Sequence, residues 1–490
     1  MTSVKKNFAY ETFLQMLMVI TPLLTAPYIA RIFGPEKNAI YSYTYSVAYY
    51  FSIFAMLGIE SYGNRSIAGV QEDREKRSTA FSEIYAIQLI TSVTLIIFYI
   101  IYVDVFVTNN KLISFLQIFS IMSTLFNINW FFWGMEEFRI TVIRSSIIKL
   151  CSVISIFIFV RSKEDLWIYT LIMSTNMLIQ QIIVWFFIPK YIDIKIPKVK
   201  NTFRHFKPNL ILFLPVISLS MYTYLDKVML GNMGTMLEVG FYASADRIID
   251  IPMSIIYGIG IVMLPRMSKL FSEKKEYEAE TYINNSLLII IFISTALMFG
   301  ISSIATEFVP IFFGNGYEPC INITILLTPV ILIKAWSNVI RTQYLIPQNK
   351  NKEYISSVLI GAIINFIFNY LLIPRYGVNG VVVGTLIAEF SVAIINTKYI
   401  NKYMNIFNIL FKGMLFLIDG IIMMVFIEIL KNNLNINSKL ILILIEIITG
   451  SFIYCILSIV TFKCIKFQPF YAFENKVIKY LKSTNISRIN

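Results

Sequence analysis

Long hydrophobic runs, separated by short polar stretches, dominate the chain from its first residues to about residue 462. A window of about 20 residues, the length that a helix needs to cross a bilayer, finds fourteen such runs. They lie near residues 9–30, 40–62, 80–103, 113–135, 143–161, 166–188, 208–231, 240–265, 285–305, 320–346, 354–373, 378–400, 409–430 and 440–462. The pattern predicts an all-α polytopic membrane protein with about 14 transmembrane helices.

Composition agrees with this pattern. Of the 490 residues 57% are hydrophobic and 14% are charged, with a mean hydropathy of +0.69, whereas soluble domains carry about 45–50% apolar and about 25% charged residues. With four cysteines and one histidine, and with no CxxC pair, neither a disulfide scaffold nor a histidine-based metal site can be built. The chain also lacks the GxxxxGK[ST], HExxH and GxSxG motifs. We therefore expect no bound cofactor, no metal and no enzymatic activity.

Positive charge is distributed unevenly between the two sides of the predicted bundle. With a cytoplasmic N-terminus, 28 Lys and Arg residues fall in segments on the inner side and 8 fall on the outer side. The positive-inside rule then places both termini in the cytoplasm. The same asymmetry accounts for most of the net charge of +13, so no nucleic-acid partner is expected.

Landmarks in the first six predicted spans recur in the next six. The first span ends in Arg31–Tyr41 and the seventh ends in Lys227–Gly231; the second closes on Gly58–Arg65 and the eighth on Gly260–Arg266. Recurrence after six spans indicates parallel repeats. We expect an N-terminal six-helix lobe at 1–205, a C-terminal six-helix lobe at 206–405, two additional helices at 406–465 and a basic cytoplasmic tail at 466–490.

This six-plus-six-plus-two plan gives the chain a resemblance to a known family. With RIFGPEKNAIYSYTYSV at 31–47 and YLDKVMLGNMGTMLEVGFYASADRI at 224–248, it resembles the polysaccharide transporters, the O-antigen and capsule repeat-unit flippases of the multidrug/oligosaccharidyl-lipid/polysaccharide exporter superfamily. The resemblance implies two lobes in a V-shaped arrangement, alternating access, and a polyprenyl-pyrophosphate-linked oligosaccharide as cargo.

Six cations lie inside the predicted spans, where a charge costs about 2.5–3.5 kcal/mol on insertion scales. Lys412 is close enough to a span end for its side chain to reach the interface. The other five are candidate binding residues for an anionic cargo such as pyrophosphate: Lys149, Lys227, Arg247, Lys334 and Arg341. Lys334 and Arg341 are seven residues apart and so share one helix face. We expect the five to form a ladder across the bilayer.

Acidic residues accompany these cations. The candidates for gating or for ion coupling are Glu60, Asp226, Asp246, Asp250 and Glu389. Asp226 adjoins Lys227, and Asp250 follows Arg247 at the i,i+3 spacing that places two side chains on one helix face. A static ion-pair network is the alternative interpretation of the same pattern.

Prolines and tyrosines leave two further alternatives open. Pro22, Pro27 and Pro215 predict kinks in the first and seventh spans, although proline is common in membrane helices. The tyrosines between residues 41 and 50 are typical of an aromatic belt at the membrane interface, and sugar stacking is the other interpretation.

The leading hypothesis is a flippase for undecaprenyl-pyrophosphate-linked repeat units in the cytoplasmic membrane of a bacterium. Its expected energy source is a proton or sodium gradient. Its expected partners are the coupling proton or sodium ion, membrane lipid, a polysaccharide polymerase and other assembly proteins. The alternatives are a multidrug or organic-cation antiporter of the same superfamily, a lipid II-type flippase, and a membrane-embedded glycan polymerase or ligase.

Overall fold

The protein is helical throughout the described part of the chain. The computed structural model describes residues 4–193, 195–197, 199–434, 436, 438–472 and 474–475, and these contain helices and no strand. Most of the predicted basic tail, 466–490, lies outside the described residues.

Contacts divide the chain into two compact units, each of which is discontinuous in sequence. Unit 1 comprises residues 1–244, 312–320 and 358–385, and unit 2 comprises 245–311, 321–357 and 386–490. Unit 1 includes α1 (Val4–Met56), α2 (Ile59–Ala68), α3 (Arg74–Phe106), α4 (Lys111–Leu116), α5 (Ile118–Phe126), α6 (Asn129–Gly134), α7 (Phe138–Phe159), α8 (Leu166–Val184), α9 (Val199–Phe203), α10 (Phe206–Ser220) and α11 (Asp226–Met233). Unit 2 includes α15 (Pro329–Ile340), α18 (Ile406–Asn433), α19 (Lys439–Cys464) and most of α14 (Pro319–Leu327). Besides α14, four helices contribute residues to both units: α12 (Met236–Ser272), α13 (Glu276–Phe313), α16 (Asn351–Tyr376) and α17 (Val378–Asn401). The predicted division into six-helix repeats concerns internal symmetry rather than contacts, and it stays a prediction.

Eleven helical segments of the described chain are long and apolar enough to cross a membrane, or twelve if the bent pair 201–218 and 223–233 is one span. Exposed large hydrophobic residues line α3, α7, α18 and α19, as expected for helices that contact lipid rather than water. The chain is therefore a multi-pass helical membrane protein. The number fourteen stays a prediction, because the first two predicted spans fall on α1, which is continuous apart from one residue.

That residue is Gly34, whose backbone φ of 71° and ψ of 178° interrupts α1. A positive φ is costly for residues with a Cβ and free for glycine. The sequence placed a loop at this position, whereas the structure interrupts the helix at this glycine alone. Pro22 and Pro27 lie inside the helix, and the kinks predicted there stay predictions. The direction of the chain thus changes at one glycine between two helical arms.

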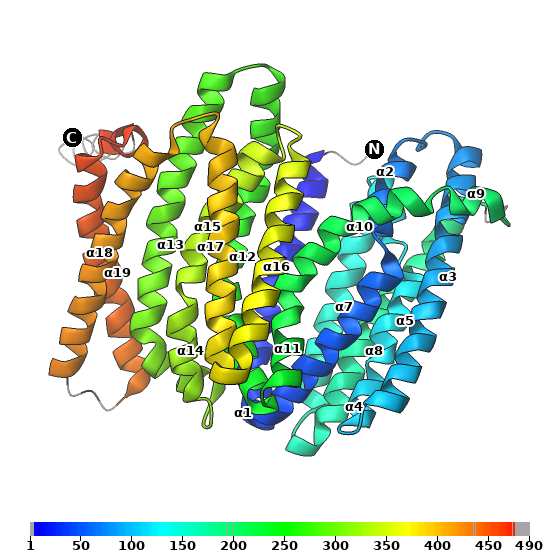
Figure 1. Cartoon of the computed structure of the whole chain (residues 1–490), viewed down its shortest axis with the longest axis horizontal. Coiled ribbons are helices and arrows are strands. Elements are labelled where there is room, and N and C mark those ends of the chain that lie inside the picture. Colours follow the sequence, from blue (N-terminus) through cyan, green and yellow to red (C-terminus); the bar gives the residue numbers. More distant parts are fainter. Residues whose placement is uncertain are drawn as a thin grey trace, which may run out of the picture. The chain divides into compact units, whose positions relative to one another are not determined.

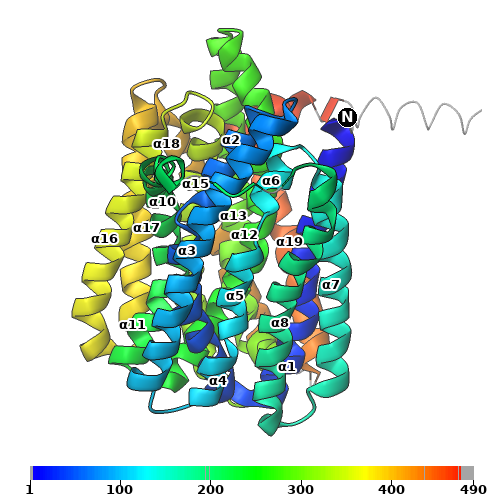
Figure 2. The ribbon, with the colours of Figure 1, turned by 90° about the vertical axis from the view of Figure 1, so that its right-hand side faces the viewer.

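The interior of unit 1 is built by α1, α3, α5, α7 and α8. α5 packs against α8 and α3, and α7 packs against α8 (Figures 1 and 2). Trp130, Phe131 and Phe132 of α6 are fully buried, and Phe81 of α3 stacks on Trp130 with ring centroids 5.4 Å apart. Gly63 allows this approach, because a Cβ there would meet the Trp130 ring.

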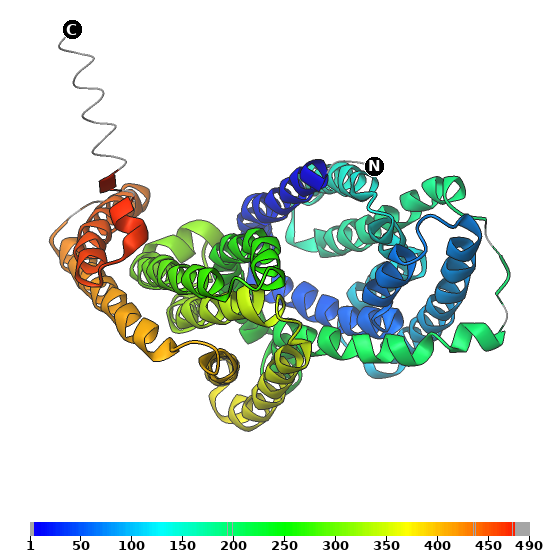
Figure 3. The ribbon, with the colours of Figure 1, turned by 90° about the horizontal axis from the view of Figure 1, so that it is seen from above.

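In unit 2, α18 and α19 form an antiparallel hairpin, drawn in orange and red in Figures 1 and 3. Met423 and Ile427 of α18 are buried with Tyr454 of α19. The Tyr454 hydroxyl donates to the Phe292 carbonyl of α13 over 2.8 Å, so the hairpin is fixed to α13 by a polar contact as well as by packing.

Two π-helical turns interrupt the spans that carry candidate residues. η3 (Met221–Leu225) separates α10 from α11, where the axis bends by 57°, and η4 (Arg341–Leu345) follows α15. π-turns frequently occur at functional sites. Each of them adjoins a candidate residue: Asp226 directly follows η3, and Arg341 is the first residue of η4.

Candidate functional site

The residues predicted from sequence fall into two polar networks, one in each unit. The network of unit 2 centres on Lys334 of α15. Its Nζ lies 3.4 Å from Oε1 of Glu389 on α17, and 23% and 9% of the two side chains are exposed. A cation within a membrane span requires a partner or a water-filled cavity, and Lys334 finds a carboxylate one helix away.

Further charged groups surround this pair. Asp246, Asp250 and Tyr257 of α12 lie close enough to Lys334 to interact with its charge, and Arg341 interacts in the same way with Tyr257. The cluster therefore joins five candidate residues, two of them cations and three of them acids. The spacing that predicted Lys334 and Arg341 on one face did not reveal that Glu389 would share the site.

The side chain of Arg341 is oriented by its neighbours. Its Nη2 donates to Asn338 Oδ1 over 2.7 Å, and its guanidinium lies 5.8 Å from the ring centroid of Tyr354. Gly260 of α12 leaves room for the Asn338 side chain, because a Cβ at that glycine would lie 2.8 Å from Asn338 Nδ2. The guanidinium is thus held at the start of η4, with its Nε buried and without a hydrogen-bond partner.

The network of unit 1 surrounds Asp226, whose exposed fraction is 1%. Its Oδ2 accepts from the Tyr242 hydroxyl over 2.6 Å and from the Thr385 hydroxyl over 3.0 Å, and its Oδ1 accepts from Asn369 Nδ2 over 2.6 Å. These partners come from α12, α16 and α17. Asp226 is thus held by neutral donors, unlike Glu389, which pairs with a cation.

Two amide atoms beside Asp226 have unused hydrogen-bonding capacity. Asn369 Oδ1 and Asn365 Nδ2 are buried without a partner, although Asn369 Nδ2 also donates to Asn365 Oδ1. Gly384 makes room for this arrangement, because a Cβ there would collide with Asn369 Oδ1. Asp226 is thus a buried carboxylate among hydroxyl and amide groups, and oxygens of these kinds are ligands for a proton or a small hard cation.

The remaining candidates lie outside these two networks. In unit 1, Glu60 accepts from Asn127 Nδ2 over 2.8 Å, Lys227 lies 5.9 Å from the centroid of the Tyr224 ring, and Lys149 is half-buried on α7. In unit 2, Arg247 is half-buried on α12. The continuous ladder of five cations stays a prediction.

Sequence reasoning missed two buried polar groups. Arg144 lies inside α7, is 7% exposed, and donates to Asn129 Oδ1 over 3.2 Å. His205 lies in the turn between α9 and α10, is buried, and has its Nε2 2.9 Å from Glu83 Oε2 and its Nδ1 2.6 Å from the Tyr62 hydroxyl. An acid at position 83, just inside an apolar run, was the available signal for the second group.

Comparisons with known proteins agree with this architecture. The sequence family described as "Polysaccharide biosynthesis protein" matches residues 4–271. The putative O-antigen transporter of Escherichia coli K12 is 24% identical over 364 residues, covering 74% of this chain and 87% of that protein. The capsular polysaccharide biosynthesis protein CapF of Staphylococcus aureus is 25% identical over 408 residues, covering 81% and 99%.

Among solved structures, the inward closed conformation of the lipid II flippase MurJ has a similar fold. Its TM-score is 0.71 at 16% sequence identity, and the match covers 93% of this chain and 98% of that one. The family match extends over more than half of the sequence, and the fold agreement extends over nearly all of it. This chain belongs to the polysaccharide biosynthesis protein family.

Proposed function

We propose that this protein is a flippase, which moves polyprenyl-pyrophosphate-linked oligosaccharide repeat units from the cytoplasmic to the outer leaflet for surface polysaccharide synthesis. One observation carries the proposal: relatives named for O-antigen transport and capsule synthesis align over 74% and 81% of this chain. The proposed setting is the cytoplasmic membrane of a bacterium with both termini cytoplasmic, as the distribution of Lys and Arg favours.

Alternating access would take the cargo past the Lys334 cluster. A pyrophosphate offers more negative charge and more acceptor oxygens than one carboxylate, so it competes with Glu389 for the Lys334 ammonium. Arg341 adds a guanidinium with a free Nε donor, and guanidinium is suited to bidentate binding of phosphate. The Lys334–Glu389 pair then acts as a gate that the cargo opens and that closes again after release.

Asp226 is the proposed ion-coupling residue. A proton or a sodium ion on this carboxylate would neutralise a buried charge and change the hydrogen bonds from Tyr242, Asn369 and Thr385. α17 carries a residue of each network, Thr385 and Glu389, four residues or about one helical turn apart. A shift of that helix on ion binding would therefore alter the acid that pairs with Lys334.

The test is complementation of a deletion strain. The wild-type gene should restore surface polysaccharide and clear the lipid-linked repeat units that accumulate on the cytoplasmic leaflet. Lys334→Ala and Arg341→Ala should restore less than a tenth of the surface polysaccharide at equal protein level. Lys412→Ala is the matched control, because it removes a cation near a span end and should complement fully.

Other outcomes of this experiment would select the alternatives. Normal surface glycan with raised sensitivity to cationic drugs would replace the proposal with an organic-cation antiporter, and arrested peptidoglycan synthesis would replace it with a lipid II-type flippase. Unpolymerised repeat units on the outer leaflet would identify a polymerase or ligase instead. Co-purification of a polysaccharide polymerase or other assembly proteins tests the proposed partners.

A further inference from the structure

An elongated apolar pocket lies within unit 2, between α13 and the α18–α19 hairpin. Its volume is about 320 Å³, which falls within the range of small-molecule sites. Its walls are Phe292, Leu297 and Ile301 of α13, Met423 of α18, and Ile447 and Tyr454 of α19, together with eight further residues. The lining on α13 extends from residue 292 to 304, or about 18 Å at 1.5 Å per residue. The pocket therefore has the form of a channel suited to an alkyl chain.

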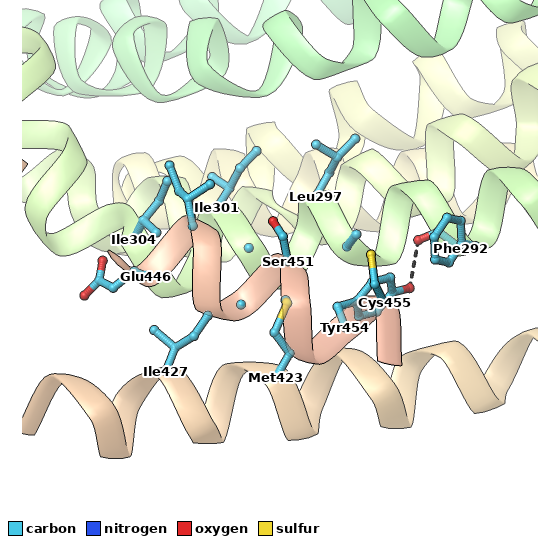
Figure 4. A pocket seen from close by; sticks show the side chains of 14 residues that line it. Phe292, Leu297, Ile301, Ile304, Met423, Ile427, Glu446, Ser451, Tyr454 and Cys455 are labelled. Carbon is cyan, nitrogen blue, oxygen red and sulfur yellow. Dashed lines mark hydrogen bonds between the residues drawn. The ribbon is translucent and has the colours of Figure 1, made fainter. Parts of the chain in front are cut away.

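One end of the pocket carries a carboxyl group. Glu446 lies at this end of the row of side chains in Figure 4, with Tyr454 and Phe292 towards the other end. Its exposed fraction is 0%, and neither carboxylate oxygen has a hydrogen-bond partner. A carboxyl group without partners inside a membrane span is costly to keep, and an ionisable residue in such a place indicates a function.

The charges around Glu446 are not balanced. Glu307 of α13 pairs with Lys431 of α18 over 2.6 Å, with only 8% and 20% of their side chains exposed. Glu446 interacts electrostatically with both members of this pair and with the exposed Glu428. Three acids thus face one ammonium, and the second oxygen of Glu307 is also buried without a partner. This end of the pocket attracts a positive charge.

We propose that this pocket binds an amphiphile with a cationic amine head, whose ammonium pairs with Glu446 while its alkyl chain lies along α13 and α19. The ammonium supplies donors to both unpartnered carboxylate oxygens and balances the surplus acid. The alkyl chain packs against the apolar lining. A free organic amine and an aminophospholipid share this chemistry.

Two glycines open the pocket. A Cβ on Gly300 would meet no atom within 4 Å, so this residue faces empty space in the pocket, whereas a Cβ on Gly450 would contact Ile427. Gly300→Leu therefore introduces a side chain into the pocket at a position where its Cβ meets no neighbour. Glu446→Gln removes the charge and keeps the shape of the side chain.

The experiment is equilibrium binding of radiolabelled dodecylamine to the purified full-length protein in a nonionic maltoside detergent, with dodecanol as the uncharged probe of equal chain length. We expect the amine to bind at least tenfold more tightly than the alcohol. Glu446→Gln should abolish this difference, and Gly300→Leu should weaken the binding of both probes. Asp419→Asn is the matched control, since Asp419 is a buried acid of the same hairpin that pairs with Thr461 outside the pocket.

Equal affinity for the amine and the alcohol would overturn the proposal, as would an unchanged preference in Glu446→Gln. Stronger displacement by farnesol than by dodecylamine would overturn it as well and would assign the pocket to an isoprenoid chain. Displacement of dodecylamine by lysophosphatidylethanolamine identifies an aminophospholipid as the ligand, and no displacement identifies a free amine. None of these results depends on glycan transport, so the flippase proposal stands or fails separately.

Discussion

The two networks bury a carboxylate in different ways. Glu389 of unit 2 faces an ammonium, whereas Asp226 of unit 1 is held by hydroxyl and amide donors that carry no charge. An ion pair is stabilising only while both partners are present, because removal of one leaves an uncompensated charge. A carboxylate in a cage of neutral donors can be neutralised without leaving an uncompensated charge on a partner, although its hydrogen bonds then change. The difference fits a gate in unit 2 and an ion site in unit 1.

The largest effect is expected from breaking the ion pair. Lys334→Met leaves the Glu389 carboxylate buried and unpaired, so it should reduce the free energy of unfolding by about 3–5 kcal/mol. The measurement is thermal or SDS-induced unfolding of the purified protein. The double variant Lys334→Met/Glu389→Leu should recover most of this loss, and a double variant as unstable as the single one would contradict the pairing.

A smaller effect on stability is expected in unit 1. Asp226→Asn preserves the size of the side chain and some of its hydrogen bonds, so it should cost about 1.5–3 kcal/mol, the range for hydrogen bonds to a charged group. Its larger consequence is functional: reconstituted transport should lose its response to a proton or sodium gradient. Gradient-dependent transport at the wild-type rate would remove Asp226 from the coupling proposal.

Each network also depends on one glycine. Gly384→Ala places a methyl group against Asn369 Oδ1, and Gly260→Ala places one 2.8 Å from Asn338 Nδ2. Each should destabilise the protein by about 1–3 kcal/mol through overpacking. The two should differ in function: Gly384→Ala should alter the ion dependence of transport, and Gly260→Ala should weaken cargo binding through Arg341. Identical functional defects in the two variants would show that the networks do not act separately.

The smallest effect is expected at an exposed ion pair. Arg74 and Asp193 lie 2.9 Å apart with 47% and 69% of their side chains exposed, and the hydrogen bond from Arg74 lowers the pKa of Asp193. Because the folded-state pKa lies below the unfolded value, the pair contributes above that unfolded value and loses its contribution as the pH falls through the folded-state pKa. Both side chains are largely exposed to water, so this contribution is small even where it is fully present, and Arg74→Ala should leave the melting temperature at pH 7 almost unchanged. A loss of stability in Arg74→Ala as large as that in Lys334→Met would show that burial does not set the difference in strength between the two ion pairs.

The sequence predicted part of each network. The apolar runs predicted that Lys334 and Asp226 lie within membrane spans, and the seven-residue spacing predicted Arg341 on the same helix face as Lys334. The pairing of Lys334 with Glu389 was not predictable, because 55 residues separate them and spacing along a helix says nothing about a neighbouring helix. The same holds for Asn369 and Thr385, which are ordinary polar residues of apolar spans until they meet Asp226.

The tyrosines illustrate the same limit. The sequence placed them in an interfacial belt or against sugars, and both interpretations stay predictions. In the structure Tyr45 and Tyr49 contact Tyr224, with ring centroids 6.0 and 4.0 Å apart. Tyr41 is 7% exposed and contacts Tyr169. Their period of four residues was visible in the sequence, but the helix that they face was not.

By itself the sequence determined that the chain is a helical membrane protein, because long apolar runs have no other stable form in a bilayer. It also identified the charged residues within the apolar spans, each of which requires a partner or a function because a charge is costly in hydrocarbon. Only the tertiary structure decided which of these charges are paired and which are held by neutral donors. It also placed Glu446 in the wall of a pocket, where its carboxylate oxygens have no hydrogen-bond partner. These outcomes depend on contacts between helices that are distant in sequence, and the periodicity of a single helix carries no information about them.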